Sequence, residues 1–539
     1  MGNRTIVLGL DGATFTILDQ LVKEGVMPFL KECMEEGVRG TLASTVPPLT
    51  PPAWTSMMTG RTPGSHGIFD FFKFESRNAR YLTLNSSRDI KCETIWSIIS
   101  RYGLKAASLN FVMMAPARPI SGYIVPGWVP WRLMKRAIYP PDFYQTLKGI
   151  PEFNLKELAT DVKVDEIAVE GCNDDEYGEW IEAHTRREDR WFDILRYVIE
   201  ENSCDLVAIV LDGVDKIQHL CWRFLNPDLF PENPSAWDIK VRDLCLDYFR
   251  KVDTYISESV RLAGPNANFF IVSDHGFTAT KEIFYLNTWL EKNGYLVWAN
   301  DTGDIEVNGK LGLGLNRKQS YLIDWTKTTA YAVSTGSNGM CICIAGDHGE
   351  YGIDHRDYAN FRKELVKRLK ELTDPTTGDQ VIVDVWTRDE IYVGNQLSQA
   401  PDITLRLRDD GFVSIRKSDV ILEPRAKPLG THHPDGVFIA WGSSMQKGIT
   451  IPKISIVDIT PILLYSLDVP IPSDLEGKVI TEIFKPSCIE TRPVRIGEPT
   501  QEPELFPRVP GQVAEGDTVL SPEDEEEIKT KLMALGYLE

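Results

Sequence analysis

The chain has 539 residues, of which 42% are hydrophobic and 25% charged, and its formal net charge is −20. This composition is that of a folded globular protein longer than one ordinary domain, and it excludes wholesale disorder and fibrous repeats. The acidic balance also argues against binding of nucleic-acid polymers, which requires a basic surface.

No targeting or membrane-spanning segment is predicted. The first apolar run, Thr5–Leu10, is too short for the core of a signal peptide, and the runs at 206–211 and 269–272 are strand-sized. The nine cysteines are odd in number and form no CxxC pair, which argues against a disulfide framework or a cysteine zinc site. We therefore expect a cytoplasmic protein, a monomer or homodimer that contacts no membrane.

Buried strands alternate with helices along the chain. Apolar runs at 6–10, 207–211 and 269–272 each end in acidic or polar residues. Helical patterns occupy about 16–36, 94–102, 177–201 and 238–263. Continuous apolar strands between helices predict an α/β/α sandwich with a mostly parallel central sheet. Ligands bind outside the carboxyl ends of the strands in such sheets, which is where the polar residues fall.

The chain is expected to divide into a core, an insertion and a tail. The first part of the core is 1–284, with a lid-like segment at 118–176 that is rich in Pro, Trp and basic residues. A smaller inserted α+β region follows at 285–395, and the core resumes at 396–485. A Pro- and Glu-rich tail at 486–539 ends in a helix that begins after Ser521 and stops at Gly536.

Four separate segments offer carboxylate and imidazole groups. They are Asp11 at a strand end, Asp215-Lys-Ile-Gln-His219, Asp274-His275, and Gly430-Thr-His432. The i, i+4 spacing of Asp215 and His219 places both on one helical face. Each segment alone is also typical of a turn, a cap or a surface helical pair. Jointly, six such ligands suit two zinc or similar divalent ions.

A fifth segment offers a hydroxyl at a helix start. Pro51 and Pro52 cannot lie inside a helix but can begin one, so Thr50 is expected at the mouth of a helix over about 52–59. Backbone N–H groups and the helix dipole favour an anion there. A metal that lowers the pKa of the hydroxyl would make Thr50 a nucleophile, whereas the alternative is an ordinary Ser/Thr N-cap.

In this order the segments resemble the alkaline phosphatase superfamily, specifically the cytoplasmic prokaryotic branch of its type I phosphodiesterase/nucleotide pyrophosphatase family. The resemblance covers residues 4 to about 480. Its motifs are Leu8-Gly-Leu-Asp11-Gly, Leu49-Thr-Pro-Pro-Ala-Trp-Thr-Ser-Met-Met-Thr-Gly60, Pro63-Gly-Ser-His66-Gly-Ile-Phe-Asp-Phe71, Asp215-xxx-His219, Ser273-Asp-His-Gly276, Gly430-Thr-His432 and a terminal Leu-Gly-Tyr-Leu.

The resemblance implies roles for these residues. Asp215, His219 and His432 would hold one metal ion, and Asp11, Asp274 and His275 the other. Zinc is the expected metal, with Mn or Mg/Fe as alternatives. Thr50, beside the second ion, would form a covalent phosphothreonine, and the two ions lie roughly 4 Å apart in such sites.

Other polar residues near these motifs are expected to play lesser parts. His433 is a weaker ligand candidate than His432, because the family's ligand directly follows the Gly-Thr step. His66 is interpreted as structural. Asp212 is interpreted as a turn residue, with orientation of a ligand as the alternative.

The sequence departs from the family at the phosphate contact. Relatives that cleave nucleotide pyrophosphates place an asparagine twenty-one residues after the nucleophile, where this chain has Phe71. Asn110 is a candidate replacement. Trp128 and Arg132 are candidate substrate contacts by stacking and charge, with an amphipathic lid surface as the alternative.

Sulfatase activity is disfavoured, because Thr50 cannot become formylglycine and Trp54 stands where sulfatases have arginine.

These features predict a metal-dependent phosphohydrolase of the phosphodiesterase/nucleotide pyrophosphatase type, acting on a small phosphate ester. An acidic protein can bind such an anion where metal ions reverse the local field. Phosphomonoesterase, phosphonate hydrolase and phosphomutase activities share the same metal site and are alternatives. A non-catalytic scaffold that keeps its metals is an alternative of another class.

Overall fold

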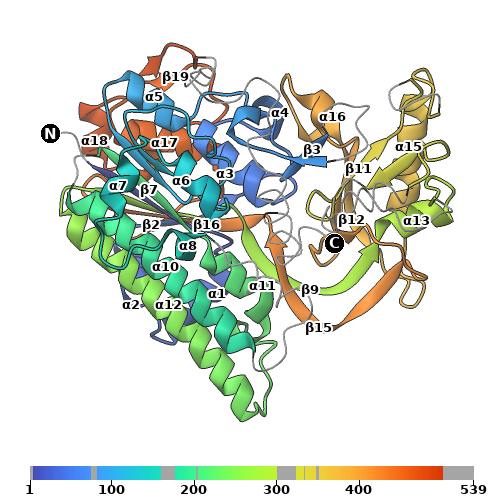
Figure 1. Cartoon of the computed structure of the whole chain (residues 1–539), viewed down its shortest axis with the longest axis horizontal. Coiled ribbons are helices and arrows are strands. Elements are labelled where there is room, and N and C mark those ends of the chain that lie inside the picture. The colour runs from blue at the N-terminus through green and yellow to red at the C-terminus, as the bar shows by residue number, and fades with distance from the viewer. Residues whose placement is uncertain are drawn as a thin grey trace.

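A nine-stranded sheet lies at the centre of the main unit (Figure 1). The computed structural model describes residues 4–74, 82–159, 176–201, 204–299, 323–332, 334–346, 351–501 and 528. The strands run in the order β17-β2-β16-β8-β1-β7-β5-β6, and β18 also pairs with β2. Their bounds are β1 Thr5–Leu10, β2 Val38–Ala43, β5 Ala106–Leu109, β6 Gly122–Val125, β7 Leu206–Leu211, β8 Asn268–Val272, β16 Asp435–Gly442, β17 Ile449–Thr450 and β18 Ile454–Ser455.

The sheet is parallel except at one strand. β1 pairs in parallel with both β7 and β8, and β5 continues the parallel order to β6. β16 runs antiparallel to β8 and to β2. Every residue of β1, β7 and β8 is buried, as expected for strands covered by helices on both faces. The predicted α/β/α sandwich with a mostly parallel sheet is confirmed.

Helices cover both faces of this sheet. In the view of Figure 1, α1, α2, α10 and α12 lie below it, and α3, α5 and α17 above it. The larger helices are α1 Phe15–Lys23, α2 Pro28–Glu36, α3 Thr50–Thr59, α5 Ile95–Arg101, α10 Glu176–Glu200, α11 Gly213–Leu225, α12 Ala236–Ala263 and α17 Ile459–Ser466. The single helical pattern expected over 16–36 forms two helices, because Gly25 adopts a φ of 75° and Pro28 starts a new helix.

The described part of the segment expected to be lid-like, 118–159 of 118–176, packs on the main core through Met134, Phe143 and Leu147. Short elements here and nearby are α4 Pro63–His66, β3 Phe72–Phe74, β4 Leu82–Leu84, α6 Trp131–Ala137, α7 Phe143–Leu147 and α8 Leu155–Leu158. Towards the end of the described chain come β19 Ile471–Pro472, α18 Pro486–Thr491 and β20 Ile496–Gly497. The helix predicted after Ser521 lies outside the described residues except for Ile528, which is helical and packs against the main core.

A second hydrophobic core belongs to the inserted region. Its four-stranded sheet has the order β10-β11-β13-β12, and a three-stranded sheet, β14-β9-β15, joins it to the main unit (Figure 1). The bounds are β9 Gly276–Tyr285, α13 Leu286–Lys292, β10 Ala330–Ala332, β11 Gly339–Ile342, α15 Tyr358–Lys370, β12 Ile382–Thr387, α16 Arg388–Ile391, β13 Ile403–Leu407, β14 Val413–Ser414 and β15 Leu422–His433. This core runs from Phe284 to Ile415 and so includes β13, beyond the boundary expected at 395.

Among the described residues, no helix combines the length and the apolar character needed to cross a lipid bilayer.

Candidate active site

The carboxyl ends of β1 and β8 bring together Asp11, Asp274 and His275. Asp11 directly follows β1, and the Asp-His pair follows the neighbouring β8. His275 Nε2 lies 3.1 Å from Asp274 Oδ2 and 3.6 Å from Asp11 Oδ1. All three residues are fully buried, and one ligand atom from each lies within 4.8 Å of the others. The three form the first candidate metal group.

A second group forms where α11 meets β15. Asp215 and His219 lie one turn apart on α11, and His432 lies near the end of β15. Asp215 Oδ1 is 3.4 Å from His219 Nε2 and 3.2 Å from His432 Nε2, and the two Nε2 atoms are 3.2 Å apart. The rings of His432 and His275 stack with centroids 3.5 Å apart, so the two groups are adjacent.

Backbone carbonyls fix the tautomers of the three imidazoles. A carbonyl oxygen only accepts hydrogen bonds, so a ring nitrogen bonded to it must carry the proton. His219 Nδ1 donates to Gly430 O (3.2 Å), His432 Nδ1 donates to Pro48 O (2.8 Å), and His275 Nδ1 donates to Gly276 O (3.1 Å). In the neutral form of each ring, the lone pair of Nε2 therefore points into its cluster. Lone pairs that converge in this way repel one another unless a cation lies between them.

The carboxylate oxygens of the two groups likewise converge and need a cation between them. Asp11 Oδ1, both side-chain oxygens of Asp215 and Asp274 Oδ2 are buried and accept no hydrogen bond of ordinary geometry from the described residues. Burial raises the pKa of Asp11 well above its usual value, and the nearby Asp274 and Asp215 charges add to the shift. Oxygen and imidazole donors of this kind suit zinc and similar divalent ions, so each group fits a divalent cation.

Thr50 lies beside the first group. It is the first residue of α3, is fully buried, and places Oγ1 3.3 Å from His275 Nε2. Pro51 and Pro52 lack N–H groups, and the N–H of Ala53 bonds to Leu49 O at 3.0 Å. The first turn of α3 can therefore present at most one N–H, that of Thr50, to an anion, fewer than the sequence suggested.

Trp54 is a site residue that the sequence interpretation missed. It lies one turn after Thr50 on α3, and its indole Nε1 donates to Asp11 Oδ2 at 3.3 Å. The indole leaves the other carboxylate oxygen, Oδ1, facing His275. The i, i+4 spacing from Thr50 was the available signal, since residues at this spacing share a helical face.

Asp212 is the centre of a buried polar network at the start of α11. Its oxygens accept from Lys216 Nζ at 2.5 Å, from Asn110 Nδ2 at 3.0 Å and from Arg187. The N–H of Gly213 donates to Glu188 Oε1 at 2.8 Å, and burial together with the Asp212 charge raises the pKa of Glu188 to about 8. This network fixes the first turn of the helix that carries Asp215 and His219.

The three predicted substrate contacts lie outside both metal groups. The Asn110 amide donates to Val210 O and Asp212, and its oxygen accepts from Arg187, so its described bonds are to protein groups. Trp128 is buried and packs against Phe71, with ring centroids 5.7 Å apart. Arg132 is exposed, with its guanidinium 5.3 Å from the ring centroid of its neighbour Trp131. Their roles in binding substrate stay predictions.

His433 and His66 also occupy defined places. His433 is half-buried, accepts from the N–H of Asp435 at 3.1 Å and belongs to neither metal group. His66 is fully buried; its Nδ1 accepts from the N–H of Ile68 at 3.1 Å, and its Nε2 lies 2.9 Å from Ser56 Oγ on α3. Nε2 must therefore carry the proton, and His66 ties the loop after α4 to the nucleophile helix.

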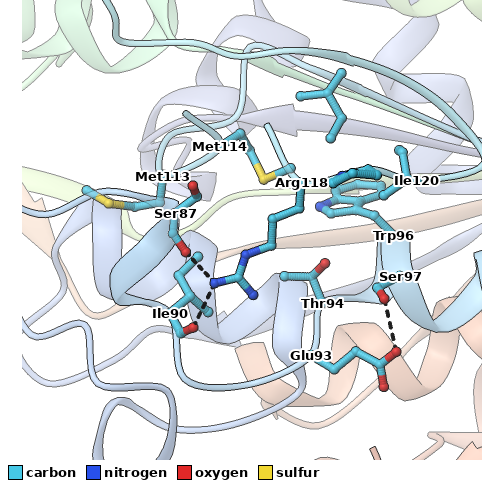
Figure 2. A pocket seen from close by; sticks show the side chains of 12 residues that line it. Ser87, Ile90, Glu93, Thr94, Trp96, Ser97, Met113, Met114, Arg118 and Ile120 are labelled. Carbon is cyan, nitrogen blue, oxygen red and sulfur yellow. Dashed lines mark hydrogen bonds between the residues drawn. The ribbon is translucent and has the colours of Figure 1, made fainter. Parts of the chain in front are cut away.

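A small pocket, partly open to solvent, lies between α5 and the segment 113–124. Figure 2 shows Arg118 reaching across it beside Met113 and Met114, with hydrogen bonds to the carbonyls of Ser87 and Ile90. None of its lining residues belongs to a metal group. The pocket is thus a feature separate from the metal groups.

The fold and the two candidate metal groups beside a buried hydroxyl are the arrangement expected of an α/β phosphoric ester hydrolase. The model of the type I phosphodiesterase/nucleotide pyrophosphatase family matches residues 5–435, and the chain belongs to this metal-dependent family.

Solved structures share the fold at low sequence identity. Human ectonucleotide pyrophosphatase/phosphodiesterase 5 is 13% identical with a TM-score of 0.52, over 89% of this chain and 100% of that chain. An inactive murine form of the same protein, in complex with AMP, is 12% identical with a TM-score of 0.51, over 90% and 100%. Phosphonoacetate hydrolase from Sinorhizobium meliloti 1021, in complex with phosphonoformate, is 16% identical with a TM-score of 0.50, over 86% and 95%.

The buried His66 predicts a pH effect on stability. Burial lowers its pKa from 6.5 to about 3, so the ring stays neutral in the folded chain while it gains a proton in the unfolded chain below pH 6.5. The stability that this neutral ring contributes is present above pH 6.5 and is lost as the pH falls towards 3, by about 1.4 kcal/mol per pH unit.

His66→Gln keeps a donor near the position of Nε2 but cannot titrate. Between pH 6.5 and 5.0, we expect urea denaturation in EDTA to show a loss of unfolding free energy about 2 kcal/mol smaller in His66→Gln than in the wild type. His355→Gln, which replaces an exposed histidine, should follow the wild type. Parallel losses in all three proteins would show that the His66 ring does not carry this effect.

Proposed function

We propose that the chain hydrolyses small phosphodiesters or pyrophosphates through a phosphothreonine at Thr50, with two divalent metal ions, most simply zinc, as cofactors. The observation that carries the proposal is the convergence of three imidazole lone pairs and the buried oxygens of three carboxylates beside the Thr50 hydroxyl. Asp215, His219 and His432 would hold one ion, and Asp11, Asp274 and His275 the other.

When bound, the ions lower the pKa of the Thr50 hydroxyl and neutralise charge on the phosphoryl oxygens. In this proposal Thr50, at the start of α3, presents Oγ1 to the phosphorus, and the helix dipole favours the anion there. Thr50 Oγ1 forms a bond to phosphorus while the bond to the leaving oxygen breaks. A water molecule then attacks the phosphothreonine and restores the hydroxyl. The net reaction consumes one water: a phosphodiester gives an alcohol and a phosphate monoester, and a pyrophosphate gives two phosphate products.

Burial of the site supports this chemistry. Thr50, Asp11 and His275 are fully buried, and electrostatic interactions are stronger where water is excluded. The Trp54 indole holds Asp11, and the carbonyl acceptors hold the imidazoles, so the charged groups need little rearrangement during the reaction.

Phosphonate hydrolysis is a second candidate. Phe71 occupies the position at which nucleotide-cleaving relatives are expected to have asparagine, and it packs against Trp128 as a buried apolar residue. The fold is also shared with a phosphonoacetate hydrolase. The cytoplasmic location and the monomeric or dimeric state stay predictions from the sequence.

The nucleophile is tested by removing its hydroxyl. In the zinc- or manganese-loaded protein, we expect faster turnover of bis(p-nitrophenyl) phosphate than of p-nitrophenyl phosphate, and a fall in kcat of at least about 10³-fold in Thr50→Ala. Thr55→Val is the matched control, since Thr55 lies buried in the same helix and its Oγ1 has no hydrogen-bond partner among the described residues. It should keep near-normal kcat.

The panel also separates the alternatives. Preferential release of phosphate from phosphonoacetate would indicate a phosphonate hydrolase in place of a phosphodiesterase. A preference for the monoester would indicate a phosphomonoesterase. Transfer of the phosphoryl group between two positions of one substrate would indicate a phosphomutase. Bound metal without turnover of any compound would favour a scaffold. Full activity in Thr50→Ala would refute the role of this hydroxyl.

The metal stoichiometry follows from the two groups. We expect elemental analysis of zinc-dialysed protein to give about two ions per chain in the wild type and about one in His432→Ala, because the first group keeps all its ligands. His433→Ala is the adjacent control and should keep both ions. Retention of both ions in His432→Ala would show that the second group is not a metal site.

A further inference from the structure

The inserted region contacts the stretch of chain that carries the nucleophile. We call residues 46–70 the nucleophile segment, because it includes Thr50 and α3. Residues 391–400 of the inserted region pack on it through a small apolar cluster of its own. In this cluster Phe69 meets Tyr392 edge-on, with ring centroids 5.0 Å apart, and both are buried.

The backbone at Gly64 and the backbone at 393–396 lie in direct contact, with no room for a side chain between them. The N–H of Gln396 donates to Gly64 O at 2.8 Å. A Cβ on Gly394 would lie 2.3 Å from Gly64 O, and a Cβ on Gly64 would lie 2.3 Å from Val393 O. Gly394 also adopts a φ of 138°, a conformation that favours glycine. Neither glycine tolerates a side chain without separation of the two regions.

Polar contacts lie at both ends of the nucleophile segment. At its end, Ser334 Oγ donates to Asp70 Oδ2, and both residues are buried. At its start, the hydroxyl of Tyr392 donates to Val46 O at 2.7 Å. The inserted region therefore holds the nucleophile segment on both sides of α3.

The contact at Val46 lies close to two functional groups. Thr50 is four residues further along the chain, and Pro48 O, between them, accepts the Nδ1 proton of His432 at 2.8 Å. One short stretch thus positions the nucleophile and sets the tautomer of a metal-group imidazole. A shift of this stretch would displace both together.

We propose that Tyr392 is a positioning residue that couples the inserted region to the active site by holding the backbone at Val46 in place. The inserted region thereby acts on the chemistry without supplying a group to the metal site. This inference rests on the proposed role of Thr50 and assigns to the insertion a function that the proposed reaction leaves open.

Tyr392→Phe tests the proposal, because it keeps the ring packed against Phe69 and removes only the hydroxyl. We expect kcat to fall about 5- to 10-fold, the scale of one buried hydrogen bond, with KM within twofold of the wild type. Hydrogen–deuterium exchange in peptides covering 44–50 should accelerate by a similar factor. Tyr285→Phe is the control: it removes a hydroxyl that bonds to the exposed Glu423 at 2.9 Å, and it should match the wild type.

Gly394→Ala is the second variant, and it should give a larger change of the same kind, since its Cβ meets Gly64 O. If the wild type turns over substrate, an unchanged kcat in Tyr392→Phe overturns the proposal whatever the exchange data show. If the wild type hydrolyses no compound of the panel, the proposed function fails separately, and the exchange of peptides 44–50 decides alone: faster exchange supports the coupling, and unchanged exchange overturns it.

Discussion

The electrostatic cost of the buried ligand groups is the constraint on which the site depends. Three carboxylates and three imidazoles are held within two adjacent clusters, with their lone pairs turned inward and little water to screen them. Burying a carboxylate without a partner costs several kcal/mol or more, so such an arrangement is stable only when cations or bound protons balance its charge. The chain brings these groups together because β1, β8 and β7, neighbours in one sheet, end beside them, and β15 of the three-stranded sheet adds His432.

Keeping those lone pairs aimed requires support from distant parts of the chain. The acceptors for the three Nδ1 protons come from the first residue of β9, from β15 and from the loop before α3. The Asp212 network holds the start of α11, and His66 holds α3 through Ser56. The contacts that hold the metal groups in place are thus the same ones that join the sheet, the nucleophile helix and the inserted region.

Local patterns in the sequence predicted much of this arrangement. The strand at 206–211, the helix pair Asp215 and His219, and the start of α3 at Thr50 follow from buried runs, helical spacing and proline positions. What local patterns could not reveal are contacts between distant residues, such as Pro48 with His432 or Val46 with Tyr392. Asn110 illustrates the limit: its amide type suggested a phosphate contact, but its partners are fixed by tertiary packing.

The charge balance explains how an acidic protein can handle an anionic substrate. Without cations the two clusters carry three carboxylates, and the chain as a whole has a net charge of −20, so the site repels a phosphate ester. Two divalent ions, as proposed, change the formal charge of the clusters from −3 to +1. The carboxylates that first attract the cations then cease to repel the ester. In the proposed mechanism metal binding therefore precedes substrate binding, and the acidic surface does not contradict the proposed activity.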